Sequence, residues 1–353
     1  MEGMRRKKEV GGRQVPESVQ FKDKIFEYTA AMQKENDRCI RMYPETTELL
    51  SKWLDDLNIQ SALNILREYA EKSGVSDRFN VPEKIYFDDE NGPAMSYSAD
   101  LNSLQINPRP LDEKLGKPEL RTPEQIITTQ ALFVKMFFHE LVHATGRVHV
   151  SDSSSVANGF AHYRADYQIG IESAIDTETR VVSNDEDLDE SAKNESSSVV
   201  LFTLLNEGIT DNISHEVLLE YIQRHPYSAD PILFKKESDT SIKDEVLTLD
   251  RDYDVARHVV LALTAAIAKE TGVSEDVVWR GFVQQYYSGE SDAQEFGSLL
   301  AETFGREIVD ALSQAQTGAD LKKLVFSNEK VNLHYVDTGQ KWLDHLHISR
   351  GAH

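Results

Sequence analysis

Apolar residues recur at helical spacing along the first part of the chain, from residue 21 to residue 74. Three stripes follow one another there: Ile25, Phe26, Ala30 and Met32; Leu49, Leu50, Trp53, Leu54 and Leu57; and Ala62, Leu63, Ile65, Leu66 and Tyr69. Spacings of three and four residues place side chains on one face of a helix, and Gly74 is suited to end the last one. We therefore predict an N-terminal helical layer over residues 19–78. The basic segment before it, residues 1–18, offers little to bury and is predicted to be a flexible tail.

The spacing of apolar residues then changes from helical to alternating. Residues 84–88, 94–98 and 103–107 each have the pattern of a short strand, and Asn91-Gly92 is a favourable turn sequence between the first two. Pro108 and Pro110 end the pattern. These features predict a small antiparallel meander over residues 84–108.

A long helix is predicted from Thr122 to about Thr145. Thr122 is suited to the N-cap, Pro123 to the first helical position, and Gly146 to the position after the end. Apolar residues lie on most sides of this helix: Ile126, Ile127, Leu132, Phe133, Met136, Phe137, Leu141 and Val142. A helix of this kind is expected to be buried.

Residues 147–200 contain one strand-like piece, at residues 167–171, followed by a polar and acidic stretch. Between Glu172 and Glu195 there are nine acidic residues against Arg180 and Lys193. Residues 172–198 are therefore predicted to form a mobile surface loop, or alternatively a lid over an active site.

Helical spacing returns after this stretch, at about residues 199–222, 253–271, 274–288 and 292–315, with a short helix near 340–347. We therefore predict two further parts of the chain: a core at residues 79–225 and a C-terminal helical subdomain at residues 226–353. The predicted fold class is α+β and mainly helical, with a small antiparallel sheet.

Composition narrows the range of functions. The net charge of −22 argues against binding to nucleic acid or to anionic lipid. A single cysteine, Cys39, excludes an internal disulfide framework and a cysteine-rich metal site. No apolar run is long enough to span a bilayer, and the start of the chain has no secretory signal pattern, so a cytoplasmic location is expected.

One motif carries recognisable chemistry, and it lies inside the long apolar helix. His139-Glu140-Leu141-Val142-His143 has the form H-E-x-x-H, which places the two histidines on one face of the helix. Both imidazoles can then bind one zinc ion, and the carboxylate of Glu140 can take a proton from a water molecule on that ion. Ionisable side chains in so apolar a helix are costly without such a partner.

An active-site zinc needs a third protein ligand and an open position. One candidate is His149, because the motif continues as H-E-x-x-H-x-x-G-x-x-H, a metzincin spacing; metzincins also need a methionine turn, and no methionine follows here. The other candidate is Glu207, which shares a helix face with Asp211. Asp211 could accept the second N–H of a ligand imidazole.

The succession HELVHATG, YRADYQIG and LNEGITD resembles the gluzincin zinc metallopeptidases, in which a later helix supplies a glutamate ligand. The segment NGPAMSYSADLNSLQIN is similar to the zincin sheet, and the resemblance covers about residues 80–270. It implies a zincin-like core in which Zn²⁺ is bound by His139, His143 and Glu207. It further implies that Glu140 is the general base and that Asp211 supports a ligand imidazole.

Two further features of such enzymes have candidates in this chain. Tyr253 and His258 open the next predicted helix and are candidates for stabilising the oxyanion, although both residue types are also common in cores and on surfaces. Residues 94–98 or 104–107 are candidates for pairing with an extended substrate.

The sequence therefore predicts a zinc metallopeptidase that acts on a peptide or protein, with Zn²⁺ as cofactor and no nucleic-acid or membrane partner. Two alternatives are a non-proteolytic zinc-binding scaffold and a zinc hydrolase of a non-peptide amide. A general base beside an open metal position favours an enzyme over a scaffold. An antirestriction-type protein, which can carry a similar motif, fits poorly with the net charge of −22.

Overall fold

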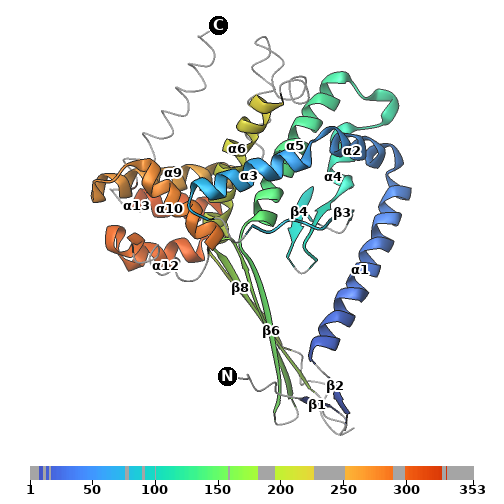
Figure 1. The fold of residues 1–353 in the computed structure, drawn as a ribbon, viewed down its shortest axis with the longest axis horizontal. Coiled ribbons are helices and arrows are strands. Elements are labelled where there is room, and N and C mark those ends of the chain that lie inside the picture. Colours follow the sequence, from blue (N-terminus) through green and yellow to red (C-terminus); the bar gives the residue numbers. More distant parts are fainter. Residues whose placement is uncertain are drawn as a thin grey trace.

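The computed structural model describes residues 8–10, 13–15, 17–75, 79–89, 92–99, 101–157, 160–181, 195–225, 251–288, 299–327 and 331. Within these ranges it describes only the backbone at residues 8–29, 149–169, 173–199, 201, 251–254, 288 and 325–326. Helices form the body, and a four-stranded sheet projects from it (Figure 1). The predicted class, mainly helical α+β, is confirmed, because helices dominate and a small three-stranded mixed sheet lies among them.

The N-terminal layer consists of three helices, α1 (Glu17–Met42), α2 (Pro44–Asp56) and α3 (Ile59–Lys72). The layer ends as predicted, because Gly74 takes a φ of +85° that residues with a side chain rarely adopt. The backbone N–H groups of Gly74 and Val75 donate to the carbonyls of Glu71 and Ala70, respectively. These two hydrogen bonds give partners to backbone carbonyl groups in the last turn of α3.

The prediction of a flexible tail over residues 1–18 is wrong for its second half. β1 (Lys8–Val10) and β2 (Arg13–Val15) form an antiparallel pair, and α1 already begins at Glu17. The basic charge of this segment concealed the sequence Gly11-Gly12 between the strands, which favours a two-residue hairpin connection. Residues 1–7 lie outside the described part of the chain.

Three short strands form the small sheet: β3 (Lys84–Phe87), β4 (Met95–Ser98) and β5 (Ser103–Ile106). Their positions match the prediction, but the antiparallel meander is wrong. The order is β3-β5-β4, so β5 is central, parallel to β3 and antiparallel to β4. Leu104 and Ile106 of β5 are almost fully buried, which explains why this strand occupies the centre. Strand β4 is left at an edge.

The predicted long helix is α5 (Pro123–Thr145), which follows α4 (Pro108–Leu115) and the short 3-10 helix η1 (Pro118–Leu120). Its start is a capping box, in which Thr122 accepts a hydrogen bond from the backbone of Gln125 and the Gln125 side chain accepts one from the backbone of Thr122. Its last two turns are buried on nearly all sides, as expected from its composition. The motif histidines are therefore held in the interior.

The four-stranded sheet overturns the prediction of an acidic loop over residues 172–198. It consists of β6 (Val148–Ala157), β7 (Phe160–Ile169), β8 (Glu172–Val181) and β9 (Glu195–Leu201), all antiparallel and in chain order. In sequence, charged residues of β8 alternate with Ile175, Thr177, Thr179 and Val181, and this alternation is typical of a strand. The count of acidic residues concealed it. Residues 182–194 lie outside the described part of the chain.

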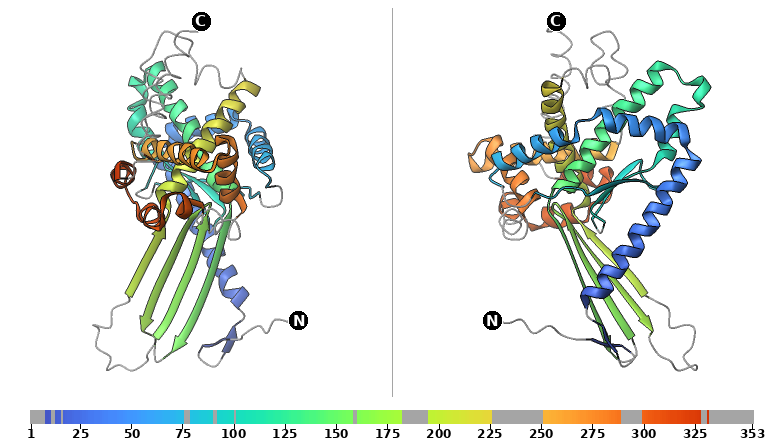
Figure 2. Two further views of the ribbon diagram at one scale, coloured as in Figure 1. Left: turned by 90° about the vertical axis from the view of Figure 1, so that its left-hand side faces the viewer. Right: turned by 45° about the vertical axis from the view of Figure 1, so that its right-hand side comes forward.

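Figure 2 shows this sheet, here called the β-arm (residues 148–201), extending away from the helical body. Both of its ends join the body: β6 follows α5 directly, and β9 leads into α6 (Thr203–Arg224). The β-arm is therefore inserted between the two helices that carry the predicted metal ligands.

Two of the later helices, α9 (Arg251–Thr271) and α10 (Glu275–Ser288), agree with the predicted ranges. Helix α12 (Arg306–Gln314) falls within the helix predicted at residues 292–315, whereas α13 (Gly318–Ser327) lies where no helix was predicted. The helix predicted at residues 292–315 is interrupted at Gly305, whose φ is +93°. Residues 289–298 and the helix predicted near 340–347 lie outside the described part of the chain.

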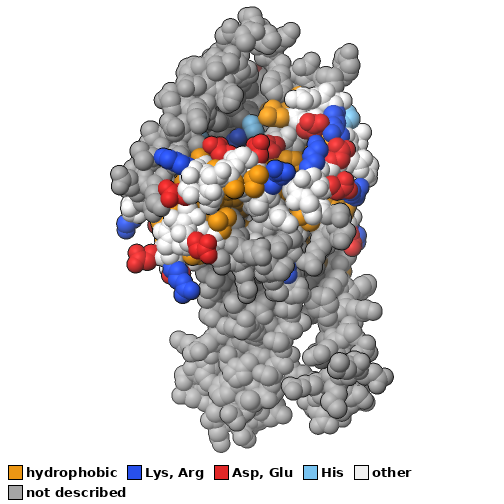
Figure 3. All heavy atoms as spheres, turned by 60° about the vertical axis from the view of Figure 1, so that its left-hand side comes forward, with side chains coloured by type: hydrophobic (Ala, Val, Ile, Leu, Met, Phe, Trp, Pro, Cys, Tyr) orange, Lys and Arg blue, Asp and Glu red, His pale blue; other side chains and the backbone are white. Residues whose placement is uncertain are grey.

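Within the described ranges, no helix combines the length and the apolar character needed to cross a bilayer. One face of the molecule shows charged side chains of both signs over the helices, and a histidine beside acidic side chains at a hollow (Figure 3).

Gly208 lets α6 approach α9 closely. A Cβ atom at this position would lie 2.6 Å from the carbonyl oxygen of Ala256 and 2.9 Å from the side chain of Val260. Both distances are too short for a real contact, and the first involves backbone of α9, which can shift only if the helix itself moves. The approach of the two helices therefore depends on glycine at position 208.

We predict that Gly208→Ala lowers the free energy of unfolding by about 1–3 kcal/mol, because the added methyl group must push α9 away. Urea denaturation measures the change. Gly281→Ala in α10 is the matched control, since no atom lies within 4 Å of its added Cβ; helix propensity should make that variant more stable by up to about 1 kcal/mol. A Gly208→Ala variant as stable as the wild type would contradict the close approach.

Candidate metal centre

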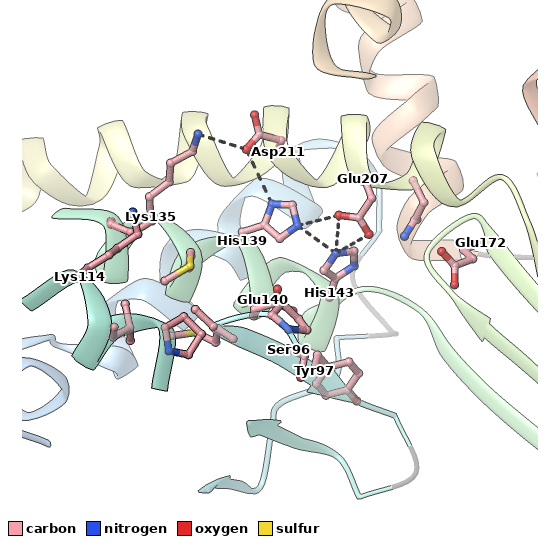
Figure 4. A pocket seen from close by; sticks show the side chains of 18 residues that line it. Ser96, Tyr97, Lys114, Lys135, His139, Glu140, His143, Glu172, Glu207 and Asp211 are labelled. Atoms are coloured by element: carbon pink, nitrogen blue, oxygen red, sulfur yellow. Dashed lines mark hydrogen bonds and ion pairs between the residues drawn. The ribbon is translucent and has the colours of Figure 1, made fainter. Parts of the chain in front are cut away.

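Two helices bring three metal-binding side chains together. His139 and His143 lie one turn apart on α5, and Glu207 lies near the start of α6. His139 Nε2 lies 2.9 Å from Glu207 Oε2 and 3.2 Å from His143 Nε2. His143 Nε2 in turn lies 3.3 Å from Glu207 Oε1. Figure 4 shows the three side chains pointing toward one another.

These distances suit a tetrahedral cation. Zinc binds imidazole nitrogen and carboxylate oxygen at about 2.0–2.2 Å, so neighbouring ligand atoms of a tetrahedral ion lie roughly 3.3–3.6 Å apart. The three donor groups offer ligand atoms that all lie within 4.8 Å of one another. They could therefore hold a metal ion, with a coordination position left for another molecule.

Asp211 lies behind His139, one helical turn after Glu207 on α6. His139 Nδ1 lies 3.8 Å from Asp211 Oδ1, which also lies 3.9 Å from Lys135 Nζ. Burial acts to raise the pKa of Asp211, but His139, Lys135 and Arg257 outweigh it, so the pKa lies below its usual range. Asp211 is therefore an ionised carboxylate in a position suited to orienting the imidazole.

Two carboxylates change the pKa of His139. Burial acts to lower the pKa of His139, but the nearby carboxylates of Asp211 and Glu207 outweigh it and raise this pKa to about 10. Burial acts to raise the pKa of Glu207. His143 and His139 act to lower it through charge and hydrogen bonding, and they hold this pKa below its usual range. A cation bound there would compete with a proton for the imidazole nitrogen.

His143 has a different supporting residue, Tyr286, which the sequence analysis missed. The Tyr286 hydroxyl lies 3.3 Å from His143 Nδ1 and accepts a hydrogen bond from Thr210 Oγ1 at 3.1 Å. Its ring is fully buried, and a Cβ on Gly146 or Gly170 would lie 2.5 Å from ring atoms. Nothing in the local sequence of α10 indicated this role, because Tyr286 lies far along the chain from the motif.

Glu140 lines the same pocket and is partly exposed in it. Burial raises the pKa of Glu140, whereas His143 and His139 lower it. The pocket is a cavity of about 430 Å³. Its lining includes β4, α4, α5 and the start of α6, with Ser96, Tyr97, Lys114, Lys135, Glu172, Asn206 and Asp211 among the polar residues. The Glu140 carboxylate, three side chains that could hold a metal ion and a cavity thus lie together.

In comparisons with known proteins, no family model, curated protein or solved structure matches this chain.

The other predicted site residues lie elsewhere or outside the described side chains. His149 is in β6, opposite Gln168 of β7, and only its backbone is described. Tyr253 lies in the first turn of α9, also with only its backbone described. His258, one turn further on, is partly buried and is not among the described residues that line the pocket. The catalytic role predicted for Tyr253 and His258 stays a prediction.

A second group of possible metal ligands, Glu35, Cys39 and Asp89, has a different character. Asp89 is buried and forms ion pairs with Arg38 and Arg109. Burial raises the pKa of the Cys39 thiol to about 11, so it stays protonated near neutral pH. Two arginines already neutralise the carboxylate that a cation would need.

We predict that Tyr286→Phe weakens zinc binding about 10- to 100-fold, because His143 loses the acceptor that orients its ring. Competition with a chromophoric chelator measures the affinity. Tyr287→Phe is the matched control, since Tyr287 is an equally buried tyrosine of the same helix with no described hydrogen bond to His143. Equal zinc affinities for the two variants would show that Tyr286 does not support His143.

Proposed function

We propose that the protein is a zinc-dependent hydrolase that cleaves peptide bonds. The observation that carries the proposal is the meeting of His139, His143 and Glu207 at distances that suit zinc, with Glu140 in the same cavity. Two histidines and one carboxylate are a ligand set used by catalytic zinc, which keeps one position open. The gluzincin resemblance of the sequence supports the same function.

A zinc ion bound there would lower the pKa of a coordinated water and polarise the substrate carbonyl. Glu140 accepts one proton of the attacking water, since its carboxylate lines the cavity beside the ligands. It then returns this proton to the leaving nitrogen as the carbon–nitrogen bond breaks. One water is consumed, and a carboxylate and a protonated amine are released, since the second proton of the water also passes to the amine.

Strand β4 is suited to hold an extended substrate. It is an edge strand of the small sheet, and residues 93–97 line the cavity. An edge strand has unpaired backbone groups to which a peptide can add as a further strand. Residues 104–107, the other candidate for this role, belong largely to the central strand β5, which has neighbours on both sides. We therefore assign substrate pairing to β4.

We predict that Glu140→Gln retains zinc but loses peptide hydrolysis by about 10²-fold or more, because the amide cannot accept the proton. Zinc content is measured by mass spectrometry, and turnover on a library of quenched fluorescent peptides. The control is Glu124→Gln, at the exposed start of α5. Full turnover by Glu140→Gln with zinc bound would remove Glu140 from the mechanism.

We predict that Glu207→Ala weakens zinc binding by about 10²- to 10³-fold, because roughly 10–16 kcal/mol of binding free energy is shared among the ligands of a protein zinc site. His149→Ala should leave the affinity unchanged. Chelator competition on both variants decides between the two candidate third ligands. The opposite result would place the imidazole of His149 on the metal.

A further inference from the structure

Glu172 occupies a position beside the metal centre that the proposed mechanism does not use. It is the first residue of β8, directly after the turn that joins β7 to β8. Its side chain lines the same cavity as His143 and Glu207, and Figure 4 shows it on the side of Glu207 away from Lys135. Its oxygens do not belong to the group of ligand atoms that lie within 4.8 Å of one another. Glu172 therefore lines the cavity and is not placed as a metal ligand.

The backbone that carries Glu172 is fixed to the metal-binding helix. The N–H of Ile171 donates to Asn206 Oδ1 at 3.0 Å, and the N–H of Gly170 donates to the carbonyl of Arg147 at 2.8 Å. Gly170 has a φ of +59°, and a Cβ there would lie 2.4 Å from Asn206 Oδ1. Because Asn206 precedes the ligand Glu207 on α6, Glu172 keeps a set position relative to the metal.

The charge of Glu172 has no cationic partner among the side chains that the structure describes. No lysine or arginine among the described side chains forms an ion pair with it, and the charged groups that act on it are Glu207 and His143. Burial and Glu207 raise the pKa of Glu172. The two lysines of the cavity, Lys114 and Lys135, lie toward the other end (Figure 4), and Lys135 is paired with Asp211. The Glu172 end of the cavity is thus acidic.

A second unused group lies on the same wall. Asn206 is fully buried and lines the cavity, and its Nδ2 has no hydrogen-bond partner among the described residues. A buried amide donor left unpaired is costly, and a ligand that accepts its hydrogen bond recovers that cost. Glu172 and Asn206 together therefore offer one anionic acceptor and one neutral donor.

We propose that Glu172 and Asn206 form a subsite for a protonated amino group of the substrate, with the carboxylate binding the ammonium and Asn206 Nδ2 donating to a neighbouring oxygen. This inference rests on the proposed hydrolase function and names its substrate class, short peptides with a primary amine next to the scissile bond. The amine can be the free α-amino group or a lysine side chain, which experiment distinguishes.

Binding of hydroxamates to the zinc-loaded protein tests the subsite without requiring turnover. Leucine hydroxamate has a free α-amine, N-acetyl-leucine hydroxamate has none, and N-acetyl-lysine hydroxamate has a side-chain amine. All three carry the same metal-binding group. Calorimetry on wild type, Glu172→Gln and the exposed control Glu124→Gln gives the affinities, after zinc content has confirmed that each variant is loaded.

We expect wild type and Glu124→Gln to bind one of the two amine-bearing hydroxamates about 10- to 100-fold more tightly than N-acetyl-leucine hydroxamate, because a buried charged hydrogen bond is gained. Glu172→Gln should abolish this preference and leave binding of N-acetyl-leucine hydroxamate unchanged, and Glu172→Asp should restore part of it. The amine that confers the preference identifies its source.

Equal affinity of wild type for all three hydroxamates would overturn the subsite while leaving the proposed hydrolase intact. A preference that persists in Glu172→Gln would also overturn it. If the zinc-loaded protein binds no hydroxamate, the metal has no open position, and the hydrolase proposal fails together with the subsite.

Discussion

The arrangement of the site depends on the burial of two imidazoles and a carboxylate between α5 and α6. Such groups are costly in an apolar interior unless they meet partners. Here they meet one another, because the packing of the helices leaves little alternative. Phe138 contacts Tyr221 edge-on with ring centroids 5.1 Å apart, and the Tyr221 hydroxyl accepts a hydrogen bond from the backbone of Asn58 at the start of α3. These contacts hold α6 against both α5 and α3 beside the polar groups.

The two histidines differ in what stands behind them. An ionised carboxylate, Asp211, lies behind His139, and a neutral phenol, Tyr286, lies behind His143. A carboxylate makes an imidazole a stronger electron donor than a phenol does, and both hold the ring in place. The supporting groups also come from different elements, α6 and α10, so three helices define the orientation of the pair.

The local part of this site could be predicted from the sequence, because it follows from spacing along single helices. The relation of His139 to His143, the relation of Glu207 to Asp211, and the capped start of α5 all depend on residues within a few positions of each other. Tyr286 and Glu172 could not be found in this way, since their roles arise from contacts between distant segments. The same limit explains the sheet: strand positions were predictable, whereas the order β3-β5-β4 depends on which strand buries more apolar surface. In β8 the alternating pattern of a strand is present in the sequence, but the many acidic residues favoured the prediction of a loop.

The β-arm connects α5, which carries the two histidines, to α6, which carries Glu207. The chain leaves the body along β6, returns along β7, leaves again along β8 and returns along β9. An even number of antiparallel strands brings a chain back to the side from which it departed, whatever the length of each strand. The separation of the ligands along the chain is therefore independent of their separation in space. Adding or removing residues in matched numbers at the distal ends of paired strands would alter the reach of the β-arm and leave α5 and α6 in place.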